Sequence, residues 1–91
     1  MAQIIGFNLS KEDYLNLANK AFKDGETEKS ISYLDKALSI DERSAEASIA
    51  LAIVYASLGA VEISNATLFK ALAEHPCADD RDRIFYQLAV N

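Results

Sequence analysis

The chain has 91 residues, enough for one domain; 51% are hydrophobic and 25% charged, with only three Gly and one Pro. This composition excludes an intrinsically disordered chain, and so few helix breakers favour an all-α domain. The net charge of −5, with acidic residues in both halves, argues against nucleic-acid binding and against attachment to an anionic membrane.

The segment 1–9 is apolar, but it has no basic region and is too short to be a signal peptide. Cys77 is the only cysteine, so an internal disulfide cannot form and a zinc site has no Cys cluster. We therefore expect a cytoplasmic protein without cofactor or metal, in which residues 1–9 form a leader before the first helix.

The first predicted helix begins after Ser10, a favourable N-cap, with Asp13 three residues later as a weaker form of the capping box. Gly25 ends this helix, because Gly adopts the left-handed conformation at little cost. A second helix is predicted over about 27–40, and Ser44 can cap the helix that follows. Apolar and small residues at spacings of three and four predict the inner faces of the two helices: Tyr14, Leu17, Ala18, Ala21 and Phe22 in the first, and Ile31, Leu34, Ala37 and Leu38 in the second.

The third and fourth helices are predicted over 45–58 and 61–74. Pro76 stops the fourth helix, since proline disfavours a helical residue before it. Asp79 then offers an N-cap for a fifth helix, predicted over about 80–90.

The sequence contains an internal repeat. When residues 11–44 are laid on 45–78, ten of the 34 positions are identical, whereas ordinary residue usage gives about two by chance. The matched residues are mostly small or apolar, which are the kinds that helix packing constrains. The identical pairs are Glu12/Glu46, Leu17/Leu51, Ala18/Ala52, Gly25/Gly59, Glu28/Glu62, Ser30/Ser64, Leu34/Leu68, Lys36/Lys70, Ala37/Ala71 and Leu38/Leu72.

Each unit resembles the tetratricopeptide repeat, a 34-residue helix–turn–helix motif. The matching residues are Tyr14-x₂-Leu17-Ala18-x₂-Ala21 and Ser30-x₃-Leu34 in the first unit, and Ser48-x₂-Leu51-Ala52-x₂-Tyr55, Ser64-x₃-Leu68 and Pro76 in the second. Ser48 departs from the large residue of the family pattern, and Glu42 departs from its proline. The resemblance implies an all-α, right-handed superhelical stack of antiparallel hairpins with about five helices. Repeat 1 would span 10–44 and repeat 2 would span 45–78, followed over 79–91 by a capping helix or the first helix of a partial third repeat.

The resemblance also implies a concave groove, lined by the first helix of each unit, that binds an extended peptide or a helix. The groove residues would be Glu12, Leu15, Asn19, Phe22 and Lys23 in the first unit, and Glu46, Ile49, Ile53, Ala56 and Ser57 in the second. Leu15 stands where the family's peptide-carboxylate clamp has a lysine, so we expect no such clamp. The remaining apolar strip, Leu15, Phe22, Ile49 and Ile53, predicts docking of an apolar or amphipathic partner. Alternatively, the strip is ordinary core, or residues 4–7 of the chain fold over it.

Catalysis requires convergent groups with tuned pKa values, and the chain offers one His, one Cys and no phosphate-binding Gly-rich loop. We expect a non-catalytic protein-interaction module, a scaffold or adaptor. The alternative is a structural domain that forms a homodimer through the groove or the C-terminal helix. Because the last predicted helix has no stop signal, the chain could also be the N-terminal piece of a longer repeat protein.

Overall fold

The structure, a computed structural model, describes residues 9–91, and this part of the chain is all-α, as predicted. Its five helices are α1 (Lys11–Lys23), α2 (Thr27–Ile40), α3 (Ala45–Ser57), α4 (Val61–Ala73) and α5 (Ala78–Val90). The ends of α3 and α4 each lie one residue before the predicted ends. The hypothesis that residues 4–7 cover the groove lies outside the described residues.

Serine residues form the N-caps of two helices, α1 and α3. At the start of α1, the Ser10 hydroxyl accepts the Asp13 N–H at 3.1 Å, and the Asp13 carboxylate accepts the Ser10 N–H at 3.0 Å. This is the predicted capping box, and it satisfies two amide donors that the helix itself leaves free. At the start of α3, the Ser44 hydroxyl accepts the Ala47 N–H at 3.2 Å, so the predicted cap is confirmed here as well.

Left-handed residues end α1, α3 and α4. Gly25 has φ 82° and Gly59 has φ 80°, and two backbone hydrogen bonds close the turn at each glycine. His75 holds the same position after α4 with φ 56°, although its side chain makes this conformation costly. Its N–H donates to the Leu72 carbonyl at 3.1 Å. Pro76 has no N–H to make the second bond of that turn, and the chain leaves the helix there.

The predicted cap of α5 is wrong. The helix begins at Ala78, with Cys77 at the N-cap position, and no side chain makes a capping hydrogen bond. The physical reason is that the Cys77 carbonyl accepts the Arg81 N–H at 2.8 Å, which closes the first helical turn before Asp79 could act as a cap. Asp79 and Asp80 lie instead in the first turn, where negative charge is favourable because of the helix dipole.

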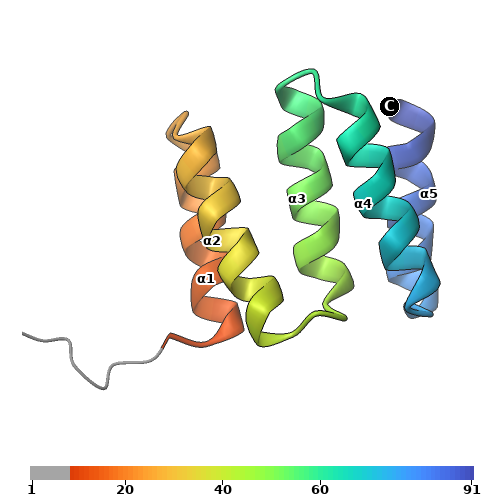
Figure 1. Cartoon of the computed structure of the whole chain (residues 1–91), viewed down its shortest axis with the longest axis horizontal. Coiled ribbons are helices and arrows are strands. Elements are labelled where there is room, and N and C mark those ends of the chain that lie inside the picture. Colours follow the sequence, from red (N-terminus) through yellow and green to blue (C-terminus); the bar gives the residue numbers. More distant parts are fainter. Residues whose placement is uncertain (1–8) are drawn as a thin grey trace, which may run out of the picture.

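Neighbouring helices in the chain pack against one another (Figure 1). The α1/α2 hairpin lies at one end of the molecule, α3 lies in the middle, and α4 and α5 lie at the other end. One core cluster joins α1, α2 and α3, and a second joins α3, α4 and α5. The buried members are Leu15, Ala18, Leu34, Ala37, Ala47, Leu51 and Val54 in the first cluster, and Ile49, Ala52, Leu68, Ala71 and Ile84 in the second. Helix α3 therefore contributes to both clusters and holds the two ends together.

A buried serine makes the same contact in each hairpin. The Ser30 hydroxyl of α2 donates to the Ala18 carbonyl of α1 at 2.9 Å. In the second hairpin, the Ser64 hydroxyl of α4 donates to the Ala52 carbonyl of α3 at 2.8 Å. Serine is small enough to let the helices approach closely, and its hydroxyl is satisfied without water.

An ion pair ties the start of α1 to the turn between α2 and α3. Lys11 Nζ lies 3.0 Å from Asp41 Oδ2, and Asp41 Oδ1 accepts the Arg43 N–H at 3.1 Å. The hydrogen bond to Asp41 raises the pKa of Lys11. The same bond lowers the pKa of Asp41, with a further contribution from the Arg43 N–H. Both charged forms are therefore favoured in the folded chain.

Candidate protein-binding surface

A cavity of about 160 Å³ is lined by residues of α1, α2 and α3, together with one residue of α5. Five of the ten predicted groove residues line it: Leu15, Asn19, Phe22, Glu46 and Ile53. Ser30, Leu34, Ala50, Val54 and Arg83 complete the lining. A cavity of about 150 Å³ holds a benzene-sized group, so this one has room for a single large apolar side chain of a partner.

Predicted groove residues of both α1 and α3 form the apolar part of the cavity. Phe22 of α1 is half-buried against the first core cluster, and Ile53 of α3 is exposed. The two positions come together because the first core cluster packs residues of α1, α2 and α3 into one body. Leu15 is buried and forms part of the floor, so it cannot be a free docking side chain.

Polar groups stand around this apolar floor. Asn19 and Glu46 are exposed at the cavity and come from α1 and α3. Arg83 reaches it from α5 and also lies 3.5 Å from the Asp80 carboxylate in its own helix. An apolar recess with both an acidic and a basic group at its edge suits an amphipathic segment better than a wholly apolar one.

The other predicted groove residues do not line this cavity. Ile49 is only 2% exposed and packs in the second core cluster with Leu68 and Ile84. Ile49 is therefore a core residue, because both α4 and α5 pack against it. Glu12, Lys23 and Ser57 are exposed at other points of α1 and α3, and Ala56 is half-buried.

The sequence prediction of the groove missed five of the ten lining residues, among them Ala50, Val54 and Arg83. Ala50 and Val54 lie on the side of α3 that faces the first hairpin. Each follows a predicted groove residue, Ile49 or Ile53, by one position in the sequence. Their apolar spacing in α3 was a usable signal. Arg83 had no such signal, because its place depends on how α5 packs.

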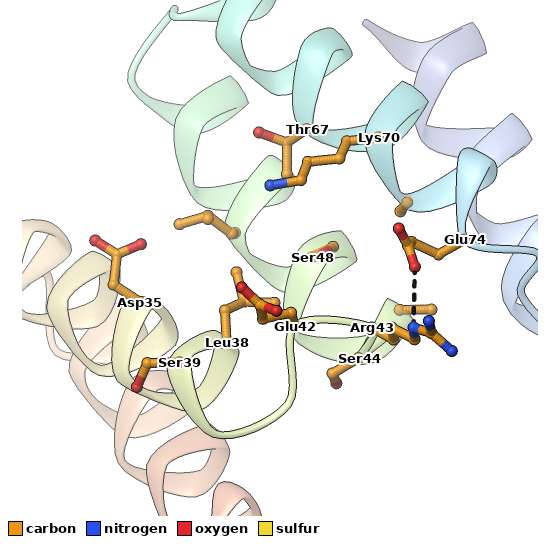
Figure 2. Close-up of a pocket in the computed structure, with 13 residues that line it drawn as sticks. Asp35, Leu38, Ser39, Glu42, Arg43, Ser44, Ser48, Thr67, Lys70 and Glu74 are labelled. Carbon is orange, nitrogen blue, oxygen red and sulfur yellow. Dashed lines mark ion pairs between the residues drawn. The ribbon is translucent and has the colours of Figure 1, made fainter.

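A second, larger recess of about 380 Å³ lies between α2, α3 and α4. Figure 2 shows Asp35 of α2 on one side of it and Thr67 and Lys70 of α4 on another. An ion pair at 3.3 Å joins Arg43 to Glu74 at its edge. Charges of both signs surround its opening, and polar atoms form a larger share of its lining than they do in the cavity beside Phe22 and Ile53.

Within residues 9–91, no group of three or more His, Cys, Asp or Glu is placed to hold a metal ion. None of the five helices of this part is long and apolar enough to cross a bilayer. No family model, curated protein or solved structure matches the chain.

Proposed function

We propose that this chain is a tetratricopeptide-like, non-catalytic interaction module of the cytoplasm, acting as a scaffold or adaptor. Its two hairpins would be consecutive repeats of a right-handed superhelical stack. The matching serine contacts at Ser30 and Ser64, and the left-handed Gly25 and Gly59, support this proposal because each pair is separated by one repeat length of the sequence.

The partner in this proposal is an amphipathic helix or an extended peptide that inserts one large apolar side chain between α1 and α3. The observation that carries the proposal is the cavity that joins Phe22 to Ile53, with Asn19, Glu46 and Arg83 around it. The apolar side chain would be desolvated on Phe22 and Ile53, which supplies affinity. The surrounding polar groups would fix its orientation.

The test is a selection of peptides from a random library on the immobilised chain, followed by titration of a selected peptide into the isotopically labelled protein. We expect NMR shift changes that centre on Asn19, Ile53 and Arg83. Replacement of the exposed Ile53 by Asp should weaken binding of that peptide by about 30-fold or more, since a charge would replace a buried apolar contact. Shift changes centred on Lys70 and Glu74 would move the site to the second recess and contradict the proposal.

Phe69→Asp is the matched control. Phe69 is a large apolar residue of α4 with an exposed side chain, and it does not line the α1–α3–α5 cavity. It should leave peptide binding unchanged. Thermal unfolding of both variants separates loss of binding from loss of the fold.

A further inference from the structure

Helix α5 packs on the α3/α4 hairpin as α3 packs on the α1/α2 hairpin. When the sequence is displaced by 37 residues, two positions of α5 and its C-cap residue fall on three α3 positions that face the preceding hairpin: Ile84 on Ala47, Leu88 on Leu51 and Asn91 on Val54. In α3, these residues belong to the core cluster shared with α1 and α2. In α5, Ile84 is fully buried in the cluster shared with α3 and α4, and Leu88 packs against it. Each helix therefore uses the same positions to dock on the hairpin before it.

The opposite face of the two helices differs. In α3, Ile49 and Ala52 are buried in a cluster with Leu68 and Ala71 of α4. The same displacement places Tyr86 and Ala89 of α5 on these positions. Tyr86 is 71% exposed and Ala89 is exposed. Within residues 9–91, the face of α5 that corresponds to the buried face of α3 is therefore exposed.

This face, which we call the Tyr86 face, consists of Phe85, Tyr86, Ala89 and Val90. Phe85 is 52% exposed and Val90 is 60% exposed. The helix has no charged residue between Ile84 and Val90, whereas five of its first six residues are charged. The apolar surface is therefore confined to the C-terminal half of the helix.

We propose that two copies of the chain associate through the Tyr86 face, with their α5 helices antiparallel. A two-fold axis requires that the face be complementary to itself. In an antiparallel pair that crosses near Gln87, Tyr86 of each copy lies against Ala89 of the other, a large side chain against a small one. The charged first turns then lie at opposite ends of the helix pair, so they do not face each other. A pairing of parallel helices would place these like charges side by side.

The size of the face makes the association weak. With about 200 Å² for a whole aromatic side chain, Phe85, Tyr86 and Val90 together expose roughly 350 Å² per copy. A standard stable interface buries about 800 Å² per partner. We therefore expect a dimer with a dissociation constant of roughly 10–1000 µM rather than an obligate one.

Sedimentation equilibrium of the 91-residue chain tests the proposal, in reducing buffer because Cys77 is exposed. Between about 5 µM and 1 mM, the average mass should rise from 10.0 kDa toward twice that value. Tyr86→Glu should weaken association at least 10-fold, and Ala89→Trp should do the same by blocking close approach. Phe69→Glu, a similarly exposed residue at 58% on α4, should not.

Two results would overturn the proposal. The first is a monomer at every concentration, which would leave the face to a later segment of a longer chain or to another protein. The second is a dimer that persists in Tyr86→Glu but is lost in Ile53→Asp, which would place self-association in the cavity between α1 and α3. Because Tyr86 and Ile53 lie on separate surfaces, failure of this proposal leaves the proposed peptide site standing.

Discussion

Replacing Ile84 by Ala should release α5 from the body of the protein while α1 and α2 stay folded. Ile84 is the one fully buried residue of α5. Truncation of a buried isoleucine to alanine costs about 2–5 kcal/mol. The other attachments are smaller: Leu88 is half-buried, and the Asn91 amide donates to the Ser64 hydroxyl at 2.8 Å and to Asn65 Oδ1 at 2.9 Å.

These contacts must offset the conformational entropy that the chain loses when α5 becomes ordered on the rest of the protein. Each hydrogen bond of Asn91 contributes about 0.5–1.5 kcal/mol, and burial of Ile84 contributes about 1.5–3 kcal/mol. Docking of α5 therefore rests on a few kcal/mol, which is the size of the loss that Ile84→Ala causes. Ile84→Val, which typically costs about 0.5–1.5 kcal/mol, should weaken docking without abolishing it.

Native-state hydrogen exchange measures this directly, because it reports the opening free energy of each helix. In Ile84→Ala, protection of the α5 amides should fall by about 30-fold or more, which corresponds to a loss of about 2 kcal/mol. The amides of α1 and α2, which share no core cluster with α5, should keep their protection. Tyr86→Ala is the control on the same helix, and it should change α5 protection little at concentrations where the chain is monomeric.

The reasoning is refuted if all five helices lose protection by the same factor. Such a result would mean that the chain unfolds as a single cooperative unit, so that α5 is not a separately docked element. Unchanged protection of α5 would also contradict it, because the buried side chain of Ile84 would then contribute nothing to docking.

Three further predictions concern stability. Ser64→Ala should lower the free energy of unfolding in urea by about 1–2 kcal/mol, more than Ser30→Ala, because Ser64 also accepts a hydrogen bond from the C-terminal asparagine. His75→Gly should raise the thermal midpoint, with a gain of about 0.5–1 kcal/mol, since it relieves a left-handed φ of 56°. Asp41→Asn should destabilise the chain at neutral pH, and pH-dependent unfolding should show the difference shrinking in acid. The lowered pKa of Asp41 means that its contribution is present above the unfolded value of 3.8 and is lost as pH falls through the folded one. The raised pKa of Lys11 keeps the pair intact until pH rises above 10.5.

Local sequence signals predicted the helices well because they act within a few residues. Ser10 and Asp13 satisfy the first amides of α1, and Gly25 and Gly59 reverse the chain where their φ angles are positive. The wrong cap of α5 was also a local failure. Asp79 looks like a cap, but the backbone after Pro76 closes the first turn of α5 before it. Charged residues at a helix start can occupy either the cap or the first turn, and the sequence pattern does not distinguish the two.

The candidate site was predicted in part for a different reason. Helical periodicity determines which residues share a face, and this was enough to bring Asn19, Phe22 and Ile53 to one cavity. It does not determine which neighbour covers that face. Ile49 was expected in the groove, but α4 and α5 bury it, and the packing of α5 carries Arg83 to the cavity. The sequence alone predicted the five helices and the 34-residue repeat of the first four. Only the tertiary packing decided which apolar residues became core and which stayed open to a partner, because burial depends on contacts between helices distant in the chain.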